Sequence, residues 1–357
     1  MKEGDLLFLE IIQISVGARS FLSKKPTEHE WKEMFATAQK QAIAGMAFDA
    51  IEKLFSKGLN IPKELLLEWI GLSEQIKSRN NVVNRRCQEV EAILRAYGYK
   101  SCLLKGQGVA LYYSTPLMRQ SGDIDVWVDR GRDSAIEALS KNGQIGHVDI
   151  KHCDWNIFQD VLVEVHFIPT WFYNPFTNKK LQKWLEGQKN IQFEHESEIG
   201  INTPTTVFNL VYVLIHIYRH LFDDGIGLRQ LMDYYYVILH STAEERQESM
   251  RVLITFRMRR IAGAVMYVLQ EVFKLDDGFF MCQPLHKDGQ FLLNEIMRAG
   301  NFGHYDERNH HQKGRLANGI ENIKRNLRFV GRYPQEVCWM PAWKIWHWCW
   351  RKRKGYL

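Results

Sequence analysis

The sequence predicts an α+β protein in which a small mixed or antiparallel sheet, with its own helices, lies between two helical regions. Apolar residues recur at helical spacing through most of the first hundred or so residues and again after Pro169. Between these regions the chain changes to short apolar runs that alternate as strands do and are separated by turn residues. We expect residues 1–98 to form an N-terminal helical region, 99–170 the α/β core and 171–357 a mainly helical C-terminal region.

The helical spacing identifies individual helices in both flanks. The N-terminal region has three such stretches, at residues 6–14, 31–54 and 65–94. Thr27 is a suitable N-cap for the second stretch, because its hydroxyl can accept a hydrogen bond from a free backbone N–H of the first turn. In the C-terminal region the same spacing covers residues 205–221, 227–240, 244–273 and 291–298.

The core has the pattern of several short strands. An apolar run at residues 101–104 ends at a glycine-containing turn, residues 123–128 alternate in strand fashion, and residues 132–141 return to helical spacing. Three further segments, at 147–153, 155–159 and 161–167, have the spacing of an antiparallel meander. We expect its turns at Cys153-Asp154 and at Asp160.

Composition and charge exclude several classes of protein. Hydrophobic residues make up 45% and charged residues 25%, which is ordinary for a globular protein. Six cysteines are scattered without a CxxC pair, and the N-terminus has acidic residues within its apolar stretch instead of a signal-peptide pattern. The most apolar runs are too short to cross a membrane. We therefore expect a cytoplasmic protein with reduced thiols and no transmembrane segment.

Asp123 and Asp125 are the most informative residues of the chain. Side chains two apart on a strand point to the same side, so the two carboxylates lie together while Ile124 and Val126 point into an apolar layer. Paired carboxylates repel each other unless a cation lies between them. Their Cα atoms would be roughly 6.6 Å apart, which lets the carboxylates converge on two ions. Mg²⁺ is the expected ion because it prefers oxygen ligands completed by phosphates and water.

A third carboxylate is expected from the strand at residues 161–167. There Val161, Val163 and Val165 form one apolar face, and Glu164 lies on the other face with His166. An unpaired glutamate inside an apolar strand costs free energy, and coordination beside Asp123 and Asp125 would remove that cost. His166 is interpreted as a structural histidine, with contact to metal or acceptor as the alternative.

Basic and glycine residues precede the aspartates. Gly106 follows an apolar strand where the chain turns into a helix, and a glycine there lets the backbone approach a phosphate closely. Lys105 either neutralises a phosphate or extends its ammonium from the strand end into solvent. Arg119, four residues before Asp123, either pairs with triphosphate oxygens or orients an aspartate.

The succession LLKGQGVALYYSTPLMRQSGDIDVWV, followed by the valine-rich Glu-x-His strand, resembles the DNA polymerase β-like nucleotidyltransferase superfamily. It is similar, more narrowly, to bacterial proteins described as uncharacterised nucleotidyltransferases. The resemblance covers about residues 103–167, and it implies that Asp123, Asp125 and Glu164 are the catalytic, metal-binding carboxylates. It also implies that Gly106 and Gln107 form the nucleotide-phosphate turn, although the superfamily usually has Gly-Ser or Gly-Gly where this chain has Gly-Gln.

The resemblance implies an activity and leaves its acceptor open. The expected activity is Mg²⁺-dependent transfer of an NMP from an NTP to an acceptor hydroxyl, with release of pyrophosphate. The acceptor would be a small molecule, sugar or antibiotic; the alternative is a toxin-like enzyme that acts on protein or RNA. A second alternative is a degenerate nucleotide-binding module without catalysis that docks on a membrane or a partner.

Tryptophans crowd the C-terminus and precede a basic run, Arg351-Lys352-Arg353-Lys354. Trp339, Trp343, Trp346 and Trp350 share one face of a predicted helix. The favoured interpretation is a helix that packs its tryptophans onto the protein, with solvated charges after it. The alternative is a weak contact with an anionic membrane surface or a partner.

Overall fold

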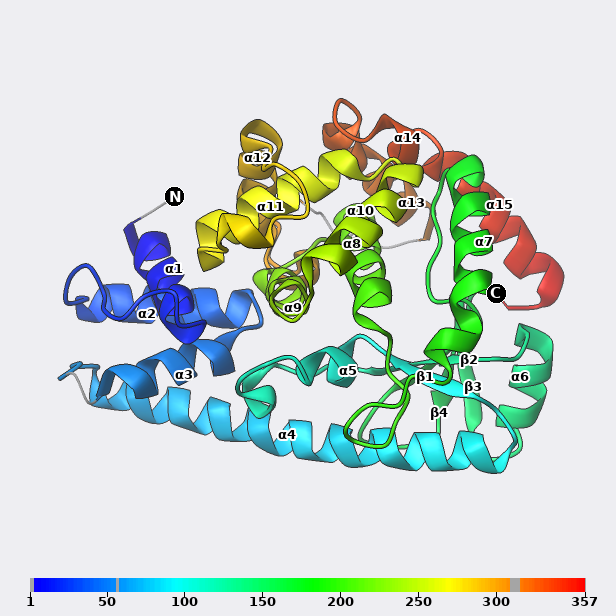
Figure 1. Cartoon of the computed structure of the whole chain (residues 1–357), viewed down its shortest axis with the longest axis horizontal. Coiled ribbons are helices and arrows are strands. Elements are labelled where there is room, and N and C mark those ends of the chain that lie inside the picture. The colour runs from blue at the N-terminus through cyan, green and yellow to red at the C-terminus, as the bar shows by residue number, and fades with distance from the viewer. Residues whose placement is uncertain (1–2, 56–57, 309–314, 357) are drawn as a thin grey trace.

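The computed structural model describes residues 3–55, 58–308 and 315–356, with Glu3 and residues 315–320 described by their backbone alone. The N-terminal region consists of α1 (Glu3–Ser15), α2 (Glu28–Lys40), α3 (Ala44–Phe55) and α4 (Lys63–Ala96). The Thr27 side chain accepts a hydrogen bond from the Glu30 backbone and caps α2 as predicted. The predicted helix at 31–54 is two helices, because the chain turns through a left-handed residue, Ala42, with φ 55°. α4 runs beneath both the N-terminal helices and the sheet (Figure 1).

A five-stranded mixed sheet forms the core, as the fold class predicts. Its strands are β1 (Ser101–Leu104), β2 (Ile124–Val128), β3 (Gln144–Val148), β4 (His152–Asn156) and β5 (Val163–His166), in the order β1-β2-β5-β4-β3. β2 and β5 are parallel and the other pairs are antiparallel. The short helices α5 (Gly106–Ala110), η1 (Pro116–Met118) and α6 (Arg132–Leu139) connect the first strands.

The predicted turn at Cys153-Asp154 is wrong. Both residues lie in the middle of β4, where they pair with Val165 and Glu164, and the chain turns at residues 149–151 instead. The prediction failed because aspartate is common in turns. On β4, Asp154 instead lies on the polar face between His152 and Asn156. Asp160 does lie in a bend between β4 and β5.

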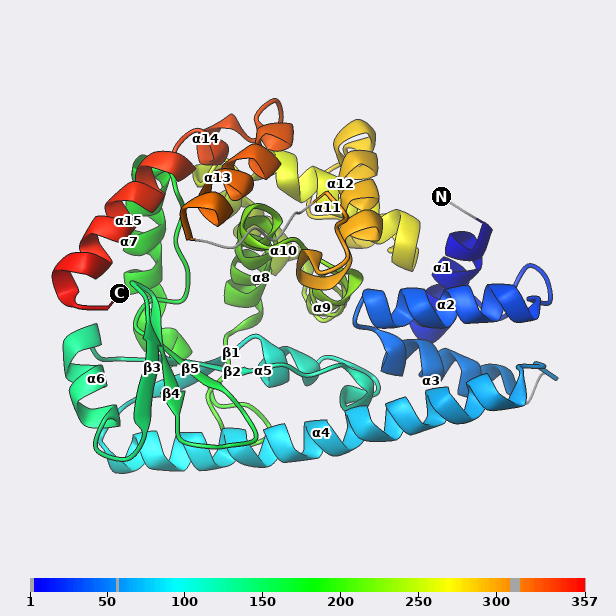
Figure 2. The same cartoon turned by 180° about the vertical axis from the view of Figure 1, so that it is seen from behind.

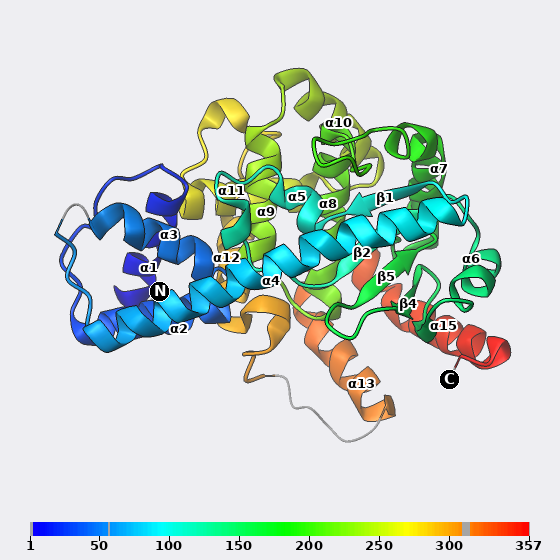
Figure 3. The same cartoon turned by 90° about the horizontal axis from the view of Figure 1, so that it is seen from below.

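The two faces of the sheet have different partners. Ile124, Val126 and Val128 pack with Val163 and Val165 into a core shared with α4 and α6. Figure 3 shows α4 crossing this side of the sheet. The opposite face carries the polar residues of β2 and β5, and on it Trp127 packs against Phe193 and Phe208 of the C-terminal region. Because successive side chains of a strand point to opposite faces, one face can be apolar while the other carries polar side chains that can bind a ligand.

The C-terminal region is helical. It contains α7 (Pro175–Gln192), α8 (Thr206–Asp223), α9 (Leu228–Leu239), α10 (Ala243–Thr255), α11 (Arg259–Phe273), η2 (Asp277–Phe279), α12 (His286–Ala299), η3 (Asn301–Gly303), α13 (Arg315–Asn326), η4 (Leu327–Phe329), α14 (Pro334–Val337) and α15 (Met340–Lys354). The predicted helix at 244–273 is broken at Arg257, which has φ 59°. Across the described ranges, none of the helices combines the length and apolar character that a membrane crossing needs.

α15 packs on the flank of the molecule beside α7 and extends towards α6 (Figure 2). Trp343 stacks on Trp171 with ring centroids 3.8 Å apart, and His347 lies 2.8 Å from Asp149. Near the end of the helix, Arg132 of α6 lies over the Trp350 ring. The side of α15 that faces the protein therefore carries part of the tryptophan cluster, while Trp346 and Trp348 remain about half exposed.

Candidate functional site

Three carboxylates meet on the polar face of the sheet. Asp125 of β2 and Glu164 of β5 are direct neighbours in the register of the parallel pair, and Asp123 immediately precedes β2. One carboxylate oxygen from each lies within 4.8 Å of the others. Glu164 therefore faces the two aspartates, because the parallel register brings position 164 beside position 125.

Asp125 is the buried centre of this group and has two basic neighbours. Lys105 Nζ lies 2.9 Å and His166 Nε2 lies 2.8 Å from Asp125 Oδ1. Burial acts to raise the pKa of Asp125, but Lys105 and His166 outweigh it and hold the pKa well below its usual range. Asp123 is affected in the opposite direction, since the charge of Asp125 raises its pKa. The side chain of Asp125 is thus held ionised.

Glu164 is also held as a carboxylate. Its Oε2 lies 3.3 Å from His166 Nε2 and 3.6 Å from His152 Nδ1. Burial acts to raise the pKa of Glu164, but the hydrogen bond with His166 and the nearby imidazoles lower it to about 2. A carboxylate with so low a pKa is a poor proton acceptor and a good ligand for a cation.

The donor set fits Mg²⁺. Asp123, Asp125 and Glu164 offer oxygen atoms only, and their mutual distances suit ligands around one ion or two neighbouring ions. Lys105 supplies one positive charge against three negative ones, so the group retains an unbalanced negative charge that a divalent cation would neutralise. A second set consists of His152, Glu164 and His166, whose ligand atoms also lie within 4.8 Å of one another. Its two imidazoles suit transition metals better than Mg²⁺.

The turn after β1 positions Lys105 and Gly106. Both residues have positive φ, 45° and 41°, a backbone region that favours glycine and strains lysine. The Gln107 side chain points away from the carboxylates, because its amide donates to Asn80 and Asn84 of α4 and is buried. Gln107 therefore joins the turn to α4. Of this turn, only Lys105 and Gly106 line the cleft that contains the three carboxylates.

Arg119 is held by a long-range ion pair. Its Nε and Nη2 lie 2.7 and 2.8 Å from the two carboxylate oxygens of Asp233 on α9, and Tyr113 also donates to Asp233. Arg119 Nη1 is buried and has no hydrogen-bond partner within the described residues. Arg229, one turn before Asp233, donates to the Gln120 carbonyl at 3.0 Å. Two guanidinium groups from different elements thus lie beside the aspartates.

A small cleft of about 110 Å³ joins these groups. Its lining includes Lys105, Gly106, Arg119 and all three carboxylates, which are six of the seven residues that the sequence predicts for the site. The i, i+4 spacing of His216 and His220 on an apolar helix favours core or hydrogen-bonded histidines over metal ligands, and no sequence pattern singles out Lys151. These two histidines, one turn apart on α8, line the cleft, and His220 Nδ1 lies 3.2 Å from Asp224 Oδ2. Two polar residues four positions apart on an otherwise apolar helix were the available signal.

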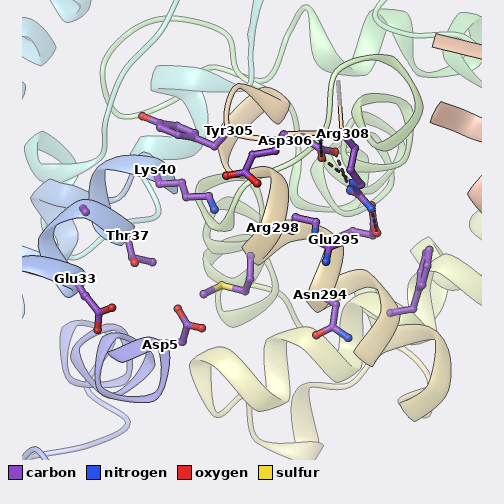
Figure 4. A pocket seen from close by; sticks show the side chains of 14 residues that line it. Asp5, Glu33, Thr37, Lys40, Asn294, Glu295, Arg298, Tyr305, Asp306 and Arg308 are labelled. Carbon is purple, nitrogen blue, oxygen red and sulfur yellow. Dashed lines mark hydrogen bonds and ion pairs between the residues drawn. The ribbon is translucent and has the colours of Figure 1, made fainter. Parts of the chain in front are cut away.

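Two larger cavities differ in their relation to this cleft. One, of about 770 Å³, adjoins it between β4, α8 and α15. The other, of about 1120 Å³, lies between α2 and α12 and shares no lining residue with the cleft (Figure 4). In the second cavity Arg308 pairs with Glu295 and Asp306, so its charges are largely neutralised from within.

Comparison with known protein families finds a similarity that extends beyond the α/β core. A family model described as "Uncharacterised nucleotidyltransferase" matches residues 27–274, from just before α2 to the end of α11. The match includes the carboxylates, the turn at Gly106, and the helices that carry Asp233 and His216. No curated protein matches the chain.

Proposed function

Because the chain belongs to this family of uncharacterised nucleotidyltransferases, we propose that it transfers an NMP from an NTP to an acceptor hydroxyl and releases pyrophosphate. We further propose that it does so in the manner of the DNA polymerase β-like superfamily. The observation that carries the proposal is the convergence of Asp123, Asp125 and Glu164 within 4.8 Å on two adjacent parallel strands. A family match that begins in the N-terminal helical region and ends in the C-terminal one, over residues 27–274, supports it.

The three carboxylates hold Mg²⁺ in this proposal. When bound there, Mg²⁺ supplies charge neutralisation for the triphosphate and lowers the pKa of the attacking hydroxyl. His166 holds the Asp125 and Glu164 carboxylates in position through contacts of 2.8 and 3.3 Å. The low pKa of Glu164, about 2, favours a role as ligand over a role as general base.

The basic side chains bind the nucleotide. Lys105 and Arg119 line the cleft beside Asp123 and neutralise the triphosphate, while the Gly106 turn brings the backbone close to it. The unpartnered Nη1 of Arg119 supports this role, since its other two nitrogens are already engaged by Asp233. Arg229, which lines the same cleft, is an additional phosphate contact.

The degenerate-module alternative is less favoured. A module that had lost catalysis has no reason to keep three acidic side chains together, because their mutual repulsion costs stability. The neighbouring charge of Asp125 does raise the pKa of Asp123, as expected for like charges held together. An acceptor that is a protein or RNA remains the principal rival to a small molecule.

The test is transfer of labelled NMP. The full chain is incubated with each α-³²P-labelled NTP, Mg²⁺ and a cell extract separated into small molecules, protein and RNA. We expect label in one fraction and loss of transfer on the order of 100-fold or more in Asp123→Asn. Asp133→Asn, which changes an exposed aspartate of α6, is the matched control. Equal transfer by the wild type and Asp123→Asn would contradict the proposal.

A further inference from the structure

The cavity of about 770 Å³ opens next to the carboxylates on a different side from the Gly106 turn. It shares four lining residues with the cleft, Lys105, Lys151, His216 and His220. Gly106 and Arg119 line only the cleft, whereas His152 and His166 line only the cavity. In-line displacement at phosphorus requires the attacking and leaving oxygens on opposite sides. A ligand in the cavity would reach the carboxylates past His152 and His166 and not past Gly106 and Arg119, which leaves the Gly106 side to the leaving pyrophosphate.

The cavity carries an excess of positive charge. Each of its three acidic residues already has a basic partner. Asp149 lies 2.8 Å from His347, and Asp223 lies 2.6 Å from Arg219. Asp224 lies 3.2 Å from His220. Its five lysines and arginines outnumber these three aspartates; they are Lys105, Lys151, Arg219, Lys344 and Arg351.

Two of these cations have no carboxylate in direct contact. Within the described residues the side chains of Lys151 and Lys344 have neither an ion pair nor a hydrogen bond, and burial lowers the pKa of Lys344 although Asp223 and Asp224 act in the opposite direction. A partly desolvated ammonium without a counter-ion is stabilised by any anion that enters the cavity.

Arg219 adds a buried donor. Its side chain is almost fully buried, and its guanidinium lies over the rings of Trp171 and Tyr173 at 3.7 and 3.9 Å. Nη2 contacts Asp223, but Nη1 has no hydrogen-bond partner in the described part of the chain. A buried N–H without a partner destabilises the folded state, because it has lost its hydrogen bond to water. An anionic oxygen in the cavity would remove that destabilisation.

The aromatic wall sets the size and type of ligand. Trp171 and Trp343 stack at 3.8 Å with an interplanar angle of 11°, and they line the cavity together with Trp348. Such surfaces suit the apolar face of a sugar or another ring. The volume of about 770 Å³ lies in the range of small-molecule sites and does not admit a folded protein or an RNA helix.

From these observations we infer that this cavity is the acceptor site of the transferase, and that the acceptor is a small molecule with a ring and a phosphate monoester. The inference rests on the proposed function and extends it to a substrate class. The phosphate lies among Lys151, Lys344 and Arg219, and the ring lies towards the tryptophans. The acceptor hydroxyl then extends past His166 towards the carboxylates.

Direct binding tests the inference without turnover. The full chain is titrated calorimetrically in EDTA with glucose 6-phosphate, ribose 5-phosphate, gluconate and glucose. We expect binding of the phosphate esters, and weaker or absent binding of gluconate and glucose. Lys344→Gln lowers the affinity for the esters about ten-fold, as expected for loss of one charge-assisted contact. Arg353→Gln on the same helix, which lines no part of the cavity, leaves it unchanged.

The outcomes separate the inference from the proposed function. Absence of phosphate-ester binding, wild-type affinity in Lys344→Gln, or tighter binding of gluconate than of the esters would overturn the inference. So would an equal loss of Mg·NTP binding in Lys344→Gln, because the cavity would then hold the triphosphate. If the esters bind as expected but no NTP donates an NMP to anything, the phosphate-ester site stands and the proposed function fails. If transfer to another acceptor proceeds without competition from the esters, the inference alone fails.

Discussion

Lys105 Nζ lies 2.9 Å from Asp125 Oδ1, and this ion pair is buried at the centre of the candidate site. The protein thus contributes one cation of its own to a group of three carboxylates. Lys105 and a bound divalent cation therefore compete for the charge of Asp125, while the same lysine is placed to contact a phosphate. Because Lys105 affects both cation binding and phosphate binding, it is the most informative position for substitution.

Lys105→Gln should separate the two roles. Removal of the positive charge should increase affinity for a divalent cation by about ten-fold, because the carboxylates lose a competing cation. The same change should lower NMP transfer, since a contact with the triphosphate is lost. Mn²⁺ binding followed by electron paramagnetic resonance measures the first effect, and labelled transfer measures the second. Lys100→Gln, at an exposed pair with Glu194, is the control. Weaker Mn²⁺ binding in Lys105→Gln would contradict the competition.

Asp123 and Asp125 should differ in the cost of substitution. Asp123 is exposed, so Asp123→Asn should remove transfer without lowering stability. Asp125→Asn leaves Lys105 and His166 beside a neutral amide in a buried place, which should cost about 3–5 kcal/mol. Urea unfolding of both variants measures the difference. Equal stability of the two variants would show that the Asp125 contacts contribute little to the folded state.

The sequence was sufficient to predict which side of each strand the carboxylates occupy, because that depends on local rules, whereas their meeting depends on the pairing of β2 with β5. A side-chain period of two places Asp123 and Asp125 together and sets Glu164 opposite its valines. The surrounding contacts depend on residues far apart in the chain, such as Arg119 and Asp233, and no local pattern identifies them. His152 escaped notice for a related reason: Cys153-Asp154 was taken for a turn, whereas β4 brings His152 opposite His166.

The Arg119–Asp233 pair should contribute to stability as well as to binding. Arg119 makes two hydrogen bonds to Asp233, and both side chains are nearly buried. Asp233→Asn should therefore destabilise the protein by about 3–5 kcal/mol, because it leaves the guanidinium buried without its counter-ion. Tyr113→Phe removes one hydrogen bond to the same carboxylate and should cost only about 1 kcal/mol. Denaturant midpoints compare the two, and a larger effect of Tyr113→Phe would contradict this assignment.

Glu336 should make stability depend on pH near neutrality. It is buried in α14 and accepts a hydrogen bond from the Tyr173 backbone at 2.7 Å. Burial raises the pKa of Glu336 to about 7, from 4.5 for an unperturbed group. The folded state therefore binds this proton more tightly than the unfolded chain does. The resulting stability is complete below about pH 4.5 and is lost as the pH rises through about 7.

Glu336→Gln tests this dependence. Glutamine keeps an oxygen that can accept from Tyr173 and has no charge to bury, so the variant should be more stable than wild type at pH 8, by up to about 3 kcal/mol. At pH 5 the two should be nearly equal. Thermal unfolding across this pH range gives the comparison, with Glu186→Gln at an exposed position of α7 as the control. A constant difference between pH 5 and 8 would rule out titration of Glu336 as the cause.

The outer side of α15 should bind anionic lipid. Ile345 and Trp346 are 67% and 51% exposed, and the helix continues into the basic residues at 351–354. An apolar side chain that inserts into a membrane interface gains about 1.5–3 kcal/mol, and the adjacent basic charges favour anionic headgroups. The full chain should therefore sediment with phosphatidylserine liposomes and less with phosphatidylcholine liposomes, and added salt should weaken the binding.

Point substitutions test this better than truncation, because α15 also forms a wall of the cavity through Lys344 and His347. Ile345→Ser combined with Trp346→Ser changes only residues outside that wall and should lower liposome binding by at least about ten-fold. Its affinity for glucose 6-phosphate should equal that of the wild type, since the cavity is intact. If both proteins sediment equally with anionic liposomes, the exposed residues of α15 are not a membrane contact, and the helix serves only to pack against α6 and α7 and to line the cavity.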